Sequence, residues 1–142
     1  MKRHFLSKRE TRDYKELLDS FGITIESKTL EIEENDHSVI FDGAVPILVR
    51  YQERWLPTLH IMKARGFPVV VIDEGAYNGI RNGANLFAAG IREVKGKLSK
   101  GSTCIIEDLN GRQVGSASVE SDESEIIGKK KGAFLKVYEL YR

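Results

Sequence analysis

The chain has 142 residues, and its 22 lysines and arginines nearly balance its 21 aspartates and glutamates, for a formal net charge of +1. This balance excludes a strongly basic nucleic-acid wrapper and an acidic disordered tail. The longest apolar runs, at 44–49 and 67–72, are far shorter than the about 18 residues that a membrane span needs. The single cysteine, Cys104, excludes an internal disulfide and a multi-cysteine metal site, and a cytoplasmic location is expected.

The glycines divide the chain into two parts of different character. Three of the 13 lie in residues 1–67 and the other ten lie in 68–142. Dense glycine permits many tight turns, which suits the short strands of a small barrel. Glycine and proline occur together at 66–68, so the sequence predicts two domains, 1–67 and 68–142.

The first predicted element is a helix over 8–21. Ser7 and Glu10 have the spacing of a capping box, and Gly22 is placed to end the helix. One apolar stripe runs along it at helical spacing: Tyr14, Leu17, Leu18 and Phe21.

Short strands are predicted next. They cover 23–25, 30–32, 39–41 and 45–51, with a hairpin turn at Asp42–Gly43. Pro46 cannot donate to a ladder, so it is expected at a strand start or edge. A short helix opens near Pro57. The first domain is therefore predicted to be mixed α and β.

The second domain begins with a buried strand at 69–72, then a helix over 74–82 with Asp73 as its N-cap. Strands are predicted at 103–108, 113–119 and 134–140, the first two joined by a turn at Asn110–Gly111. Several short strands with one helix predict a small β-barrel, so the fold class of the whole chain is α+β.

Residues for catalysis are not apparent. His4, His37 and His60 are scattered without metal-ligand spacing, and no nucleophile elbow or phosphate-binding loop is present. The Asp73–Glu74 pair is better explained by helix capping than by acid–base work. We therefore predict a non-catalytic protein with no metal and no cofactor.

Two segments could bind a ligand. Lys129, Lys130 and Lys131 stand between two glycines and form a positive patch that can contact phosphate, or equally a solubilising loop. The other segment is Arg81, Asn82, Gly83, Ala84 and Asn85, where little side-chain bulk would let a ligand backbone approach. Taken alone, this second segment is explained as a helix C-cap.

The residues of the second half resemble the start of a PUA domain, the RNA-binding module of pseudouridine synthases and archaeosine transglycosylases. The resemblance rests on the stretches 70–76 and 81–91 and covers 68–142. The matching positions are Asp73, Ala76, Gly83, Ala84, Leu86, Phe87, Gly90 and Ile91. Ala89 stands where proline is common.

The first half adds a second resemblance. The stretch 55–59, with Pro57 and Thr58, followed by a short helix, is similar to the arrangement of a pre-PUA and a PUA domain in the malignant-T-cell-amplified-sequence family and its archaeal relatives. This resemblance implies a small mixed α/β N-terminal domain followed by a PUA-type β pseudo-barrel. It also implies a cytoplasmic setting of archaeal or eukaryotic type.

The resemblance implies an RNA-binding surface at 81–85. The lysines at 129–131 could flank this surface, but the family does not fix lysines at those positions. Leu86, Phe87 and Ile91 are expected in the core, and Tyr77 could either stack on a base or pack inward.

The function expected is binding of tRNA or rRNA in translation initiation, re-initiation or ribosome recycling. Structured RNA, an SUI1-domain protein and the small ribosomal subunit are the implied partners. Two alternatives remain: a protein-interaction adaptor, favoured by the near-zero net charge, and an accessory subunit of an RNA-modification enzyme.

Overall fold

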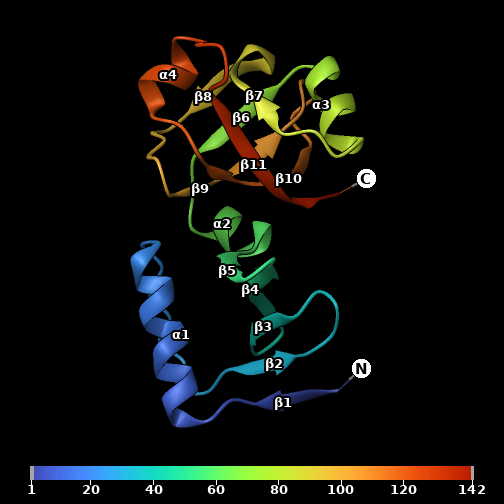
Figure 1. Ribbon diagram of the computed structural model, residues 1–142. Helices are drawn as coiled ribbons and strands as arrows, with labels where there is room; N and C mark the ends of the chain where they lie inside the picture. The colour runs from blue at the N-terminus through green and yellow to red at the C-terminus, as the bar shows by residue number, and fades with distance from the viewer. Residues whose placement is uncertain (1, 142) are drawn as a thin grey trace. The chain divides into compact units, whose positions relative to one another are not determined.

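Figure 1 shows the computed structural model, which describes residues 2–141. The chain divides into two compact units, residues 1–65 and 66–142. Each unit has a sheet of its own. The predicted boundary after residue 67 lies two residues further along the chain.

The N-terminal unit is built on an antiparallel sheet of five strands in the order β1-β2-β3-β4-β5. The strands are β1 (Arg3–Phe5), β2 (Glu31–Glu33), β3 (Val39–Asp42), β4 (Val45–Tyr51) and β5 (Arg54–Pro57). The helices are α1 (Lys8–Ser20) and α2 (Leu59–Ala64). Short connections join β2 to β5 in sequence order, whereas helix α1 lies between the paired strands β1 and β2.

Helix α1 begins as predicted. The Glu10 backbone N–H donates to Ser7 Oγ at 3.1 Å, and the Ser7 backbone N–H donates to the Glu10 carboxylate at 3.0 Å. Tyr14 of the apolar stripe meets Trp55 of β5 edge to face, with ring centroids 5.5 Å apart. The capping box therefore starts the helix, and the stripe joins it to the sheet.

Two details of this unit refine the expectations. Ile23 and Ile25 are buried as in a strand, but their segment is not paired in the sheet, so the strand predicted at 23–25 is wrong. Burial holds this segment in place together with two hydrogen bonds, from the Ile23 N–H to the carbonyl of Leu18 and from Arg65 Nη2 to the carbonyl of Thr24, each 2.9 Å long. Pro46 lies opposite Phe41, where the register of β3 and β4 shifts, which is an irregularity that tolerates a missing N–H.

The C-terminal unit has a six-stranded sheet in the order β7-β11-β10-β9-β6-β8. Its strands are β6 (Val69–Ile72), β7 (Leu86–Phe87), β8 (Ile91–Lys95), β9 (Thr103–Glu107), β10 (Gln113–Val119) and β11 (Phe134–Leu140). Its helices are α3 (Glu74–Arg81), the 3₁₀ turn η1 (Ala88–Gly90) and α4 (Glu123–Ile127). Only β6 and β9 pair in parallel; the other pairs are antiparallel. The predicted α+β class is confirmed.

The core of this unit lies between the sheet and α3, α4 and η1. Leu86 and Ile91 belong to it, as predicted, but Phe87 is 50% exposed and the expectation that it is buried is wrong. The physical reason is the alternation of a strand, which sends Leu86 inward and its neighbour outward. No helix within residues 2–141 is long and apolar enough to cross a membrane.

Cys104 is fully buried in β9, and the loss of hydration raises the pKa of its thiol to about 12. Because the thiolate is the reactive form, we expect the native chain to react with Ellman's reagent at pH 8 at least about 100-fold more slowly than the urea-unfolded chain. Similar rates in the two states would contradict the placement of Cys104 in the core.

Gly90 leaves no room for a side chain beside α3, because a Cβ there would lie 2.5 Å from the Cβ of Ala76. We expect Gly90→Ala to lower the free energy of unfolding by about 1–3 kcal/mol in urea titrations. Gly79→Ala is the matched control. Its Cβ would meet only ordinary contact at 3.9 Å inside α3, so stability should rise by up to about 1 kcal/mol. Equal effects of the two changes would refute this packing.

Candidate nucleic-acid interface

Helix α3 is held at its first turn by Asp73. The Asp73 carboxylate accepts the backbone N–H of Ala76 at 2.8 Å, and its own N–H donates to the carbonyl of Gly90 at 3.0 Å. Arg92 Nε lies 3.4 Å from the other carboxylate oxygen. The carboxylate therefore caps a helix and pairs with a guanidinium, in agreement with the capping interpretation.

The segment after α3 is a bend at the surface. All five of its residues, 81–85, are exposed. Gly83 has φ +89°, which disfavours a side chain, and nothing lies within 4 Å of the position a Cβ would take. The bend is thus open to a ligand from outside.

Three backbone N–H groups of this bend are already hydrogen-bonded. The backbone N–H groups of Asn82, Gly83 and Ala84 all donate to carbonyls of the last turn of α3, at Gly79 and Ile80. These bonds cap the helix, whose C-terminal end carries a partial negative charge. A phosphate at this bend would therefore have to be bound by side chains.

Two aromatic rings lie beyond the bend. Phe87 of β7 and Phe134 of β11 are directly paired in the antiparallel register, so both side chains project from the same face. Their ring centroids are 6.1 Å apart. Half of Phe87 is exposed, and Phe134 is partly exposed. An exposed aromatic pair offers π-faces on which bases can stack.

The three lysines at 129–131 are exposed in the loop between α4 and β11. None of them makes an ion pair within residues 2–141. Lys129 has φ +53°, and the Lys130 backbone N–H donates to the carbonyl of Glu125 at 2.9 Å. The loop is therefore ordered by its main chain while its ammonium groups stay uncommitted.

The register of β7 and β11 shows how these parts are related. Leu86 pairs with Leu135, and Phe87 pairs with Phe134. The Ala88 N–H then donates to the carbonyl of Ala133. The bend at 81–85 therefore lies next to the Leu86–Leu135 end of this strand pair, and the lysines at 129–131 lie next to the Phe87–Phe134 end. We call the bend, the two phenylalanines and the lysines at 129–131 the β7 surface.

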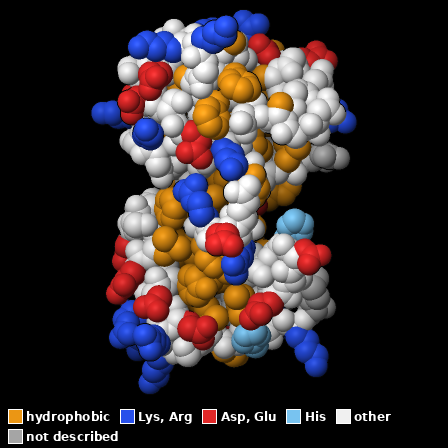
Figure 2. Space-filling model, in the orientation of Figure 1, with side chains coloured by type: hydrophobic (Ala, Val, Ile, Leu, Met, Phe, Trp, Pro, Cys, Tyr) orange, Lys and Arg blue, Asp and Glu red, His pale blue; other side chains and the backbone are white. Residues whose placement is uncertain are grey.

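Figure 2 shows hydrophobic atoms on this unit where β7 and β11 run in Figure 1, and basic atoms around the loop that follows α4. The aromatic pair lies between the two sequence-predicted segments along this strand pair. That pair was not predicted from the sequence. Residues 86–88 are all apolar, so no alternation in the sequence marks Phe87 as the outward-facing side chain.

A pocket of about 400 Å³ lies on another side of α3, facing the turn between β9 and β10. Its α3 wall includes Tyr77, Asn78 and Arg81, and its other wall includes Leu109 and Asn110. The sequence left the orientation of Tyr77 open; the side chain is partly buried against the core of this unit and also lines this pocket, with the Arg81 guanidinium 5.5 Å from its ring centroid. We call this cavity the α3 pocket.

Asp108 organises the far wall of the α3 pocket. Its carboxylate accepts the backbone N–H groups of Asn110 at 2.9 Å and Arg112 at 3.0 Å, and also Arg112 Nε at 2.8 Å. Desolvation favours a higher pKa for Asp108, but these hydrogen bonds and the Arg112 charge outweigh it and lower the pKa. The carboxylate therefore stays charged and holds the turn at neutral pH.

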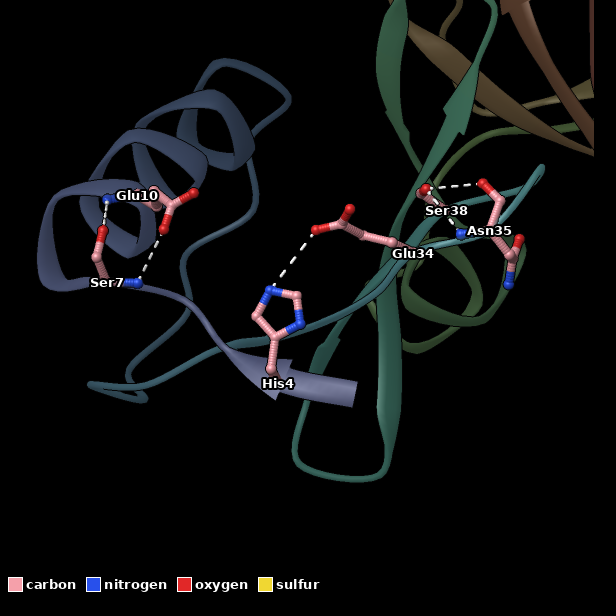
Figure 3. A network of polar contacts seen from close by, with 6 residues as sticks. All are labelled: His4, Ser7, Glu10, Glu34, Asn35 and Ser38. Carbon is pink, nitrogen blue, oxygen red and sulfur yellow. Dashed lines mark hydrogen bonds and ion pairs between the residues drawn. The ribbon is translucent and has the colours of Figure 1, made fainter. Parts of the chain in front are cut away.

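The N-terminal unit carries a separate polar network, drawn in Figure 3. His4 Nε2 lies 3.6 Å from the Glu34 carboxylate, next to the capping box. Hydrogen bonds from the backbone and side chain of Ser7 lower the pKa of Glu10. No three histidine, cysteine or acidic side chains within residues 2–141 are grouped to hold a metal. These contacts order the start of the chain.

Comparison with known proteins covers both units. Residues 68–140 match the PUA domain, and residues 2–65 match a domain of unknown function, DUF1947. Glutamate 5-kinase of Sinorhizobium fredii is 38% identical over 66 residues, which are 45% of this chain and 17% of the kinase. The chain thus spans about a sixth of the length of the first curated relatives it matches.

Solved structures extend the likeness to both units. A conserved PUA-domain protein of Thermoplasma acidophilum has 26% identity and a TM-score of 0.70, covering 98% of this chain and 93% of that one. A PUA-domain structure from Aeropyrum pernix has 26% identity and a TM-score of 0.73, covering 99% and 85%. A chain of the archaeal box H/ACA sRNP Nop10–Cbf5 complex has 25% identity and a TM-score of 0.50, covering 54% and 24%. The chain belongs to the PUA-domain family, and the PUA domain forms its C-terminal unit.

Proposed function

We propose that this chain binds structured RNA at the β7 surface of its PUA domain. The observation that carries the proposal is the exposed pair Phe87 and Phe134, with an open glycine bend at one end and three uncommitted lysines at the other. Aromatic rings beside cations are the combination that holds unpaired bases together with their phosphates.

The family supports the same proposal. PUA domains are RNA-binding modules, and the Nop10–Cbf5 chain that this protein resembles over 54% of its length comes from an sRNP. A fold alone does not assign a function, so the weight rests on the residues of the β7 surface.

Different parts of the β7 surface can bind different parts of an RNA. The lysines at 129–131 attract phosphates and contribute an affinity that depends on salt. The phenylalanines stack on bases, and this stacking does not depend on the base sequence of the RNA. The bend at 81–85 admits the RNA strand closely because Gly83 carries no side chain, while Arg81 offsets the negative end of α3. Recognition by shape follows from this arrangement.

A nearly neutral protein can use such a surface. The formal charge of +1 gives little long-range attraction. Local cations next to a stacking platform therefore have to carry the affinity. We expect binding to be moderate and to favour RNA with an exposed single-stranded element over uniform duplex.

The finer assignment is tRNA or rRNA bound in translation initiation, re-initiation or ribosome recycling, without catalysis and in the cytoplasm. It is supported by the resemblance to the malignant-T-cell-amplified-sequence family, which also implies an SUI1-domain protein and the small ribosomal subunit as partners. A second candidate, an accessory subunit of an RNA-modification enzyme, is favoured by the likeness to the Nop10–Cbf5 chain. In that case the protein should copurify with such an enzyme, also after nuclease treatment.

Charge reversal at the two ends of the β7 surface tests the electrostatic part. We expect Arg81→Glu with Lys130→Glu to weaken binding of total tRNA by at least about tenfold at 0.1 M salt. The slope of log K against log salt should become shallower by about 1.5–2, because two phosphate contacts are lost. Filter binding at several salt concentrations measures both.

The matched control is Lys8→Glu with Lys28→Glu, which changes the net charge equally but on exposed residues of the N-terminal unit. If the control variant lost as much affinity and slope as the test variant, the β7 surface would not be the binding site.

Stacking is tested by Phe87→Ala. Loss of one stacked base should weaken RNA binding by about 1–3 kcal/mol, or about 5- to 150-fold, with no change in the salt slope. Phe5→Ala, which removes an exposed ring from β1, should have no effect. Unchanged affinity of the Phe87 variant in the same titration would remove the aromatic pair from the proposal.

A further inference from the structure

The α3 pocket has the make-up of a small ligand site, and the β7 surface does not use most of it. Its two walls come from different elements, α3 and the turn between β9 and β10. Its volume of about 400 Å³ suits one nucleotide rather than a folded partner.

Each wall of the pocket presents an apolar surface. Tyr77 lines it from α3, and Leu109 lines it from the tip of the turn. Leu109 is 61% exposed, so its side chain is open to a ligand in the pocket. A flat aromatic ligand between Tyr77 and Leu109 would stack on the ring on one side and cover the leucine on the other.

The polar groups of the pocket are available for a ligand. The side-chain amides of Asn78 and Asn110 take part in no hydrogen bond within residues 2–141. An asparagine amide both donates and accepts, which matches the N6 donor and N7 acceptor of adenine. Arg112 Nε donates to the Asp108 carboxylate, which ties the guanidinium to the far wall of the pocket, beside the two amides that can read a base edge.

Charges at the two ends of α3 orient the ligand. Arg81 stands at the last residue of the helix and Glu74 at the first, about 10 Å apart along its axis. A phosphate is favoured at the Arg81 end, and the Glu74 carboxylate can accept a ribose hydroxyl at the other. Because Arg81 also begins the bend at 81–85, a strand on the β7 surface can continue into the pocket.

We propose that the α3 pocket binds one unpaired adenine ribonucleotide of the RNA held at the β7 surface. The base stacks on Tyr77 under Leu109, and Asn78 and Asn110 read its edge. The inference rests on the proposed RNA binding for the source of the nucleotide, while its chemistry rests on the pocket alone.

The turn that carries Leu109 and Asn110 is organised before any ligand arrives. Three donors converge on the Asp108 carboxylate, and the Asp108 N–H donates to the carbonyl of Arg112 at 2.9 Å. Asp108 is thus a positioning residue. A wall that is already ordered loses little conformational entropy on binding.

The direct test uses AMP as the probe, titrated into the ¹⁵N-labelled full chain. We expect amide shifts at 74–81 and 108–112, with binding at least fivefold weaker for CMP and for dAMP. Tyr77→Ala should weaken AMP binding at least fivefold, and Asn78→Ala with Asn110→Ala should remove the preference over CMP. Phe5→Ala, which removes an exposed ring from the N-terminal unit, is the control and should leave AMP binding unchanged. Absence of shifts at these residues, or equal binding by the Tyr77 variant, would overturn the inference.

A second arm separates this inference from the proposed function. It compares a hairpin RNA with a single bulged adenine and the same hairpin fully paired. Tighter binding of the bulged hairpin, lost in Tyr77→Ala, supports both proposals. Equal binding of the two hairpins, still dependent on Phe87, overturns the pocket assignment and leaves the proposed function standing. Binding of AMP without binding of either hairpin supports the pocket as a site for a free nucleotide and overturns the proposed function.

Discussion

The close approach of α3 to the turn η1 is the constraint on which both candidate sites depend. Asp73 caps the helix and binds the carbonyl of Gly90, and the missing side chain of Gly90 lets Ala76 approach. This junction sets the direction of α3. The direction of α3 in turn decides where its C-terminal bend meets β7 and which face of the helix lines the α3 pocket. This close contact beside the Asp73 cap therefore positions the surfaces that we assign to RNA.

Local charge, rather than total charge, explains how such a protein can bind a polyanion. The lysines at 129–131 are uncommitted, whereas Arg92 and Arg112 are each paired with an aspartate. The paired cations hold structure and the free ones face solvent. The bend at 81–85 adds shape rather than backbone donors, because its N–H groups cap α3. Affinity should then come from side chains and stacking, with the glycine making room for them.

Local patterns predicted local structure well. The capping box of Ser7 and Glu10 and the cap at Asp73 are confirmed, because each depends on residues a few positions apart. Pairing between distant segments could not be predicted from the sequence. The register of β7 with β11 separates the glycine bend from the lysines and exposes Phe87, and the turn at Asp108 meets α3 only in three dimensions. An apolar run such as 86–88 shows no preference for a face until its partner strand is known, so Phe87 was misplaced. The roles of residues 81–85 and 129–131 in RNA binding stay predictions.

The central claim is that RNA occupies the β7 surface. Mapping of backbone amide shifts on adding a short structured RNA tests it most directly. The account predicts that the perturbed amides cluster at 81–87 and 129–134, with the N-terminal sheet β1 to β5 unaffected. Shifts confined to the N-terminal sheet, or to parts of the C-terminal unit outside these two segments, would contradict it.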